Sequence, residues 1–166
     1  MALVAGPFLK FCGLDAGRWV VSVLVVADAQ VPQFVFAVDG QPEQSVQGQL
    51  LYQFQRSNFW VCRYAVTQSE KVQIVTYRVE SGAASEGSSW TVPAAGSMPT
   101  MAYGSCAGFH SARDAQRYGA ARHERWQHLL QRHRDLQQGK GEHPEEQPYS
   151  LLLLGGDQVY ADSIWT

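Results

Sequence analysis

Three residues that can bind a metal ion follow two short apolar stretches of the chain. Cys106 closes the stretch TMAYGSC, and Asp157 and Tyr160 follow the run YSLLLLGG. A thiolate, a carboxylate and a phenolate are all metal ligands, and the two glycines before Asp157 allow the backbone to turn and expose the carboxylate. The combination predicts a metal site, provided that the two apolar stretches end close together.

The segment YGSCAGFHS (103–111) has two other interpretations. In the simpler one it is a turn at a strand end, and Cys106 is a small buried apolar residue. In the other, Gly104–Gly108 is a nucleophile elbow, G-x-nucleophile-x-G, with Cys106 as the nucleophile of an α/β-hydrolase. That fold needs a histidine after its acid, whereas all five histidines of this sequence precede Asp157. Asp157 also has a simpler interpretation, as the cap of a following turn.

The elements around these residues form a strand–helix–strand pattern. Strands are expected at 100–106 and 149–156, and the segment 111–138 between them has helical spacing of its apolar residues. The run of four leucines is typical of a parallel strand that is buried on both faces. Since two strands joined by a helix run parallel, both should end at the edge of the sheet where α/β proteins bind ligands. The ends of the two strands, which carry Cys106 and Asp157, would then lie roughly 5 Å apart if the strands are neighbours, or roughly 10 Å apart with one strand between them.

The histidines of the expected helix do not suggest a second metal site. His123, His128 and His133 are spaced by five residues and therefore drift around the helix, unlike a ligand pair at positions i and i+4. With the neighbouring arginines they predict a solvated basic face.

The first half of the chain has a different pattern. Short stretches rich in β-branched and aromatic residues predict strands at 18–26, 33–38, 48–55, 58–66, 71–79 and 88–92. Such a series predicts a β-sandwich of the immunoglobulin or fibronectin kind, and ESGAASEGSS (80–89) is expected to be a loop. The change of pattern predicts two domains, a β-sandwich at 1–95 and the start of an α/β domain at 96–166.

Composition sets limits on partners and location. Charged residues make up 17% of the chain, hydrophobic residues 45%, and the formal net charge is −2. This balance is that of a globular protein with no nucleic-acid partner. The three cysteines form no disulfide framework, and no signal peptide or membrane-spanning segment is recognised. A cytoplasmic location is therefore expected.

The motifs of the second half resemble those of a known family. The sequence GSC at a strand end, then a helix, then LLLLGGDQVYAD is similar to the PhoD-like alkaline phosphatases, a branch of the calcineurin-like metallophosphoesterases. The preceding β-sandwich, which opens with AGPFLKF, also resembles the N-terminal domain that many of these proteins carry. The resemblance covers essentially the whole chain but only the N-terminal portion of a family member.

The resemblance implies roles for individual residues. Cys106 and Tyr160 would bind a ferric ion, Asp157 would bridge that iron and a calcium ion, and Asp162 would be structural. The two ions would clamp a phosphate ester and activate the attacking hydroxide, as in a phosphomonoesterase or phosphodiesterase.

Further asparagine, histidine and aspartate ligands of the family do not follow in this sequence. The chain as given is therefore expected to be inactive, and the phosphate ester would be a substrate of the full-length form. The alternative functions are a non-catalytic β-sandwich interaction module and, third, a fragment of a cysteine-nucleophile hydrolase.

Overall fold

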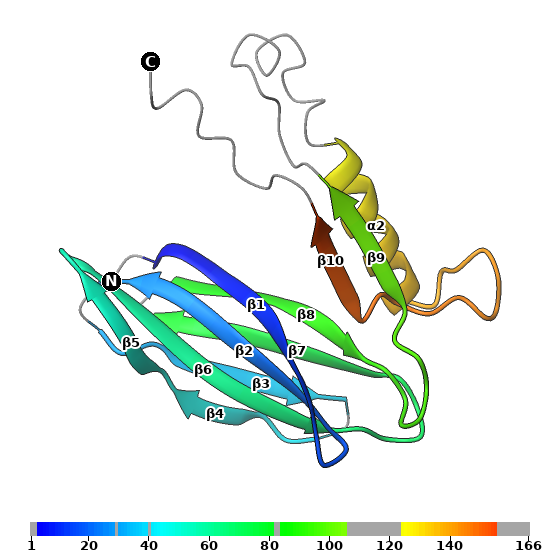
Figure 1. The fold of residues 1–166 in the computed structure, drawn as a ribbon, viewed down its shortest axis with the longest axis horizontal. Coiled ribbons are helices and arrows are strands. Elements are labelled where there is room, and N and C mark those ends of the chain that lie inside the picture. Colours follow the sequence, from blue (N-terminus) through cyan, green and yellow to red (C-terminus); the bar gives the residue numbers. More distant parts are fainter. Residues whose placement is uncertain (1–2, 29, 40, 82–83, 106–123, 156–166) are drawn as a thin grey trace, which may run out of the picture. The chain divides into compact units, whose positions relative to one another are not determined.

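A computed structural model of the chain describes residues 3–28, 30–39, 41–81, 84–105 and 124–155. The chain forms two compact units, Met1–Met98 and Pro99–Thr166 (Figure 1). The change of sequence pattern predicts a boundary between residues 95 and 96, in the same connecting segment.

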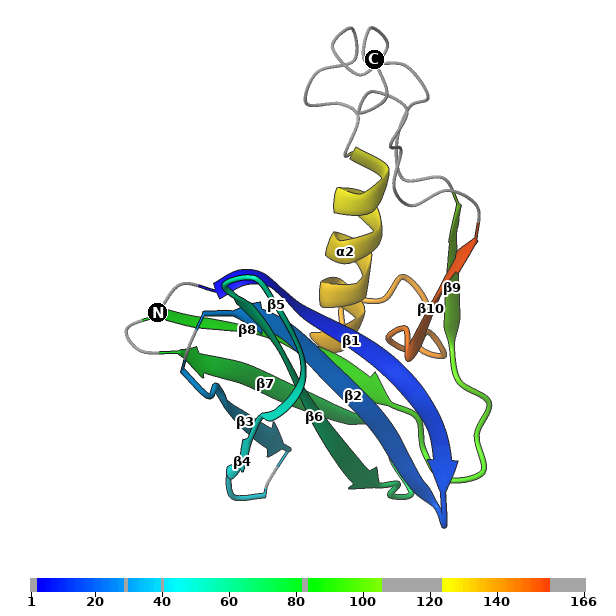
Figure 2. The same ribbon diagram turned by 60° about the vertical axis from the view of Figure 1, so that its left-hand side comes forward.

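The N-terminal unit contains two four-stranded antiparallel sheets, seen as two layers in Figure 2. The first sheet has the order β1 (Leu3–Asp15), β2 (Arg18–Ala27), β6 (Ser57–Thr67), β5 (Gln49–Phe54). The second has the order β4 (Gln44–Gln47), β3 (Gln33–Val38), β7 (Gln73–Ser81), β8 (Ala84–Val92). The predicted β-sandwich is confirmed, and its strand order matches the A-B-E-D and C′-C-F-G sheets of immunoglobulin domains.

The core of this unit lies between the two sheets. Along β2, side chains at alternate positions from Trp19 to Val25 are buried, as expected for a strand with one face toward a core. Phe36 of β3 stacks on Tyr64 of β6, from the opposite sheet, with ring centroids 4.0 Å apart. Trp90 of β8 meets both rings edge-on at 6.0 and 6.4 Å. The buried aromatic residues therefore join the two sheets.

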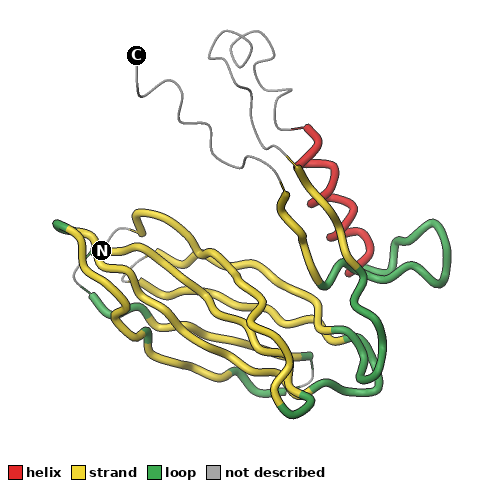
Figure 3. The backbone as a smooth tube through the Cα atoms, viewed as in Figure 1, coloured by secondary structure: helices red, strands yellow, loops and turns green. Residues whose placement is uncertain are grey.

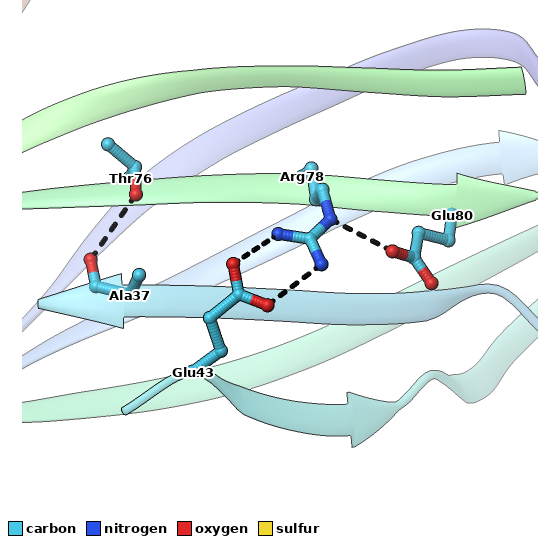
Figure 4. A network of polar contacts seen from close by, with 5 residues as sticks. All are labelled: Ala37, Glu43, Thr76, Arg78 and Glu80. Atoms are coloured by element: carbon cyan, nitrogen blue, oxygen red, sulfur yellow. Dashed lines mark hydrogen bonds and ion pairs between the residues drawn. The ribbon is translucent and has the colours of Figure 1, made fainter. Parts of the chain in front are cut away.

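A polar network on the surface holds the segment before β4 against β7 (Figure 4). Arg78 donates hydrogen bonds to both carboxylate oxygens of Glu43, at 2.7 and 2.9 Å, and one to Glu80 at 2.8 Å. The hydrogen bonds to Glu43 and then to Glu80 raise the pKa of Arg78, and the bond from Arg78 lowers the pKa of Glu43. Because these groups are largely exposed, the network orients the chain more than it stabilises it.

The C-terminal unit contains β9 (Met101–Ser105), helix α2 (Glu124–Gln137) and β10 (Leu151–Gly155) (Figure 3). The two strands are hydrogen-bonded neighbours and run parallel, from the pair Leu151 and Met101 to the pair Gly155 and Ser105. The expected strand–helix–strand order with parallel strands is therefore present. The helix ends with a bond from Lys140 N–H to Asp135 C=O, the outer bond of a Schellman cap. The first part of the expected helix, before Glu124, lies outside the described residues.

The expectation that the leucine run is buried on both faces is wrong. Leu152, Leu153 and Leu154 are 46%, 47% and 55% exposed. Parallel sheets are covered on both faces when enough elements pack on them. Here the described part of the unit offers one helix and one neighbouring strand, and these leave about half of the surface of the three leucines uncovered.

No helix in the described part of the chain is both long and apolar enough to span a membrane.

The aromatic contact between the sheets gives a stability prediction. Because Phe36 is fully buried between Tyr64 and Trp90, Phe36→Ala should lower the free energy of unfolding by about 3–5 kcal/mol. The control is Phe8→Ala on β1, where the side chain is 55% exposed and the change should stay within about 0.5 kcal/mol. Urea unfolding of the two variants measures the difference, and equal losses would show that the core lies elsewhere.

Candidate functional site

The carboxyl ends of β9 and β10 are the described part of the predicted metal site. Ser105 ends β9, Gly155 ends β10, and the two residues are paired directly. The two ends are therefore separated by one strand spacing, roughly 4.8 Å, and the alternative with an intervening strand is wrong. The predicted ligands Cys106, Asp157 and Tyr160 lie outside the described residues.

A tyrosine that the sequence did not single out lies at this same edge. The ring of Tyr103 covers Gly155, and a Cβ atom at position 155 would be 2.8 Å from Tyr103 Cε2 and 2.9 Å from Cζ. Only glycine leaves room for the ring there, so the first glycine of the GGD sequence has a packing role. The phenol of Tyr103 is thereby held at the end of β10, two residues before Asp157. The sequence signal that could have identified this contact is the aromatic residue Tyr103 in the first of the two expected parallel strands, followed by a glycine at the end of the second.

A second close contact brings the helix onto the sheet. The indole of Trp126 lies over Gly104, where a Cβ atom would be 2.6 Å from Trp126 Cη2. Ala102, two residues earlier on the same face of β9, is buried, as is Leu136 near the end of α2. The glycine at position 104 is therefore explained by the close packing of the helix on strand β9. This removes one reason for interpreting GSCAG as a nucleophile elbow.

The connection from α2 to β10 is fixed by one carboxylate. Glu146 accepts hydrogen bonds from the backbone N–H groups of Glu142 at 2.6 Å and His143 at 3.0 Å. It also accepts a bond of 2.6 Å from Arg132 of α2. These bonds lower the pKa of Glu146, with the His143 N–H as the largest cause. The loop that leads into β10 is thus attached to the helix.

The predicted solvated basic face on the helix is present only in part. His128 and Arg134 are exposed, as expected. His133 is instead half-buried and stacks on Tyr149, with ring centroids 6.0 Å apart. Burial, and to a smaller extent the charge of Arg134, lowers the pKa of His133. The neutral imidazole is therefore part of the packing between the helix and the loop, whereas His123 lies outside the described residues.

Within the described ranges, no three histidine, cysteine, aspartate or glutamate side chains gather closely enough to hold a metal ion. The two described cysteines are free thiols in the N-terminal unit, Cys12 exposed and Cys62 buried. Burial raises the pKa of the Cys62 thiol to about 11, so it remains protonated at neutral pH.

Comparison of the chain with protein-family models, with curated proteins and with solved structures found no match.

The role of Glu146 predicts a pH effect. Its pKa is lowered in the folded state, so its contribution to stability is present above the ordinary value near 4.5 and is lost as the pH falls through the folded pKa. Glu146→Gln should therefore be less stable than the wild type at neutral pH, with the difference shrinking below about pH 5. Unfolding free energies measured across this range test it. Glu145→Gln, an exposed neighbour, is the control, and an equal effect there would contradict the assignment.

The contact between Tyr103 and Gly155 predicts a coupling between two substitutions. Gly155→Ala should push the Tyr103 ring off the strand and weaken the β9–β10 pair by about 1–3 kcal/mol. In a Tyr103→Ala background the same change should cost much less, because the clashing ring is gone. Hydrogen exchange of the amides in β9 and β10 measures the loss, and equal effects in the two backgrounds would contradict the contact.

Proposed function

We propose that the C-terminal unit carries part of the metal site of a phosphoric ester hydrolase, with Cys106, Asp157 and Tyr160 as ligands. The observation that supports it is the direct parallel pairing of Ser105 with Gly155. The chain leaves both strands at one edge, and this edge is where open α/β sheets bind their ligands. A metallophosphoesterase of the PhoD-like kind is the family whose motifs the two strand ends resemble.

The donor set fits the proposed ions. Thiolate and phenolate suit a polarisable transition metal such as iron, and a carboxylate suits calcium and can bridge two ions. Iron and calcium bound there would clamp the oxygens of a phosphate ester and lower the pKa of a bound water. The chain itself supplies the charge and position of the ligands. Tyr103 lies against Gly155 at this edge, and its phenol would supply a hydrogen-bond donor to a ligand or to the ester.

The alternative of a cysteine nucleophile uses the same residue without a metal. In that case Cys106 needs a general base, and the described histidine with the lowered pKa, His133, is already stacked on Tyr149. A non-catalytic interaction module is favoured by a different observation, the exposed apolar residues of β5 in the sandwich.

Ferric ion binding by the chain tests the proposed ligands. Titration with ferric nitrilotriacetate should produce the visible charge-transfer band of an iron-bound phenolate. Tyr160→Phe should abolish the band. Cys106→Ser and Asp157→Asn should weaken binding by about tenfold or more, since even residues that only orient a ligand contribute about that much.

Matched controls come from the N-terminal unit. Tyr52→Phe changes an exposed tyrosine and Cys62→Ser a buried thiol, and both should leave the titration unchanged. A band that persists in Tyr160→Phe, or no binding by the wild type, would refute the proposed ligand set. Hydrolysis of para-nitrophenyl acetate that resists a chelator and requires Cys106 would instead support the cysteine nucleophile.

A further inference from the structure

Strand β5 is an edge strand whose side chains are all exposed. It ends the order β1-β2-β6-β5, so within the described residues no strand pairs with its outer edge (Figure 1). Its six residues, QLLYQF, are exposed without exception. Leu50, Leu51, Tyr52 and Phe54 are 52%, 65%, 59% and 55% exposed. An apolar edge with free backbone donors and acceptors is a template for another strand.

The other three edges of the sandwich carry features that discourage strand addition. β1 contains Pro7 and an exposed Lys10, and its pairing with β2 shifts register at three places. β4 has only four residues and follows Pro42 closely. β8 includes Glu86 in its sequence. Charges, prolines, bulges and short length are the usual protections of edge strands.

By contrast, β5 has no charged residue and no proline. Its pairing with β6 shifts register once, between Leu50 and Tyr52. The two outer-facing aromatic residues lie beyond this shift. Tyr52 is opposite Phe59, with ring centroids 5.9 Å apart, and Phe54 is opposite Ser57. Because Phe59 alternates with the buried Asn58 and Trp60, these aromatic side chains face away from the sandwich core.

We propose that the outer edge of β5 pairs antiparallel with β5 of a second copy of this chain. The two sheets β1-β2-β6-β5 would join into one continuous sheet across a two-fold axis. The charges favour this occupant and this direction. An uncharged strand meets its own copy without like charges opposite one another. Antiparallel pairing would place the two Arg56 residues, which follow β5, at opposite ends of the paired strands, whereas parallel pairing would bring them together at one end.

The size of the contact sets its strength. Stable complexes bury about 1,200–2,000 Å² in total, and a pair of six-residue strands with four exposed apolar residues in each copy supplies less. The dimer should therefore form in the micromolar range of protein concentration and dissociate on dilution.

Sedimentation equilibrium of the full chain across a range of concentrations tests the proposal. The wild type should change from monomer to dimer. Leu51→Lys and Gln53→Lys each place a charge on the pairing strand, and each should raise the dissociation constant by about tenfold or more. Both positions are exposed, so the monomer should keep its fold, which far-ultraviolet circular dichroism checks. Two variants are used so that one that fails to fold does not decide the result.

The matched control is Leu153→Lys on β10, the same change at a leucine that is 47% exposed in the other unit. It should leave the dimer intact. Hydrogen exchange should show β5 amides protected as the concentration rises, while β4 amides stay unchanged. A wild type that remains monomeric throughout would overturn the proposal. Binding of β5 only to a strand of a different protein would overturn it as well. A dimer that Leu153→Lys breaks and the β5 variants do not would also overturn it, and would place the contact on β10.

Discussion

Phe36 of one sheet stacks on Tyr64 of the other at 4.0 Å, and this contact depends on a single register. Tyr64 faces inward only because β6 pairs with β2 without a shift, from Arg18 and Thr67 to Ala27 and Asn58. A slip by one residue would turn every inward side chain of β6 toward solvent. The regular pairing of β2 with β6 therefore determines the core, and with it which surfaces of the sandwich stay exposed.

In the described part of the C-terminal unit, close contacts at glycines bring the helix and the two strands together. Gly104 admits Trp126 and Gly155 admits Tyr103, so the two strands are covered by aromatic rings where a Cβ atom would block them. The same strands end side by side at Ser105 and Gly155. The contacts that shape the small sheet thus lie next to the edge proposed for the metal site, and a substitution at either glycine would disturb both.

Local patterns predicted most of the sandwich strands because alternation is a property of neighbouring residues. Strand β1 was not predicted, since Gly6, Pro7 and Gly13 interrupt its pattern and it pairs with β2 only through register shifts. The small-residue segment 80–89 was expected to be a loop, but Ala84–Val92 forms β8. Its glycine and serines give no strand signal, and pairing with β7 provides the stabilisation that their side chains do not.

The sequence by itself determined the strand–helix–strand order, the parallel direction of β9 and β10, and the residue types that follow them. These depend on chain order and local periodicity. Only the tertiary structure decided that Ser105 and Gly155 are direct partners, that His133 packs on Tyr149, and that the leucines of β10 and the whole of β5 are exposed. Pairing partners and burial depend on residues far away in the chain, and an apolar run has the same sequence whether or not another element covers it.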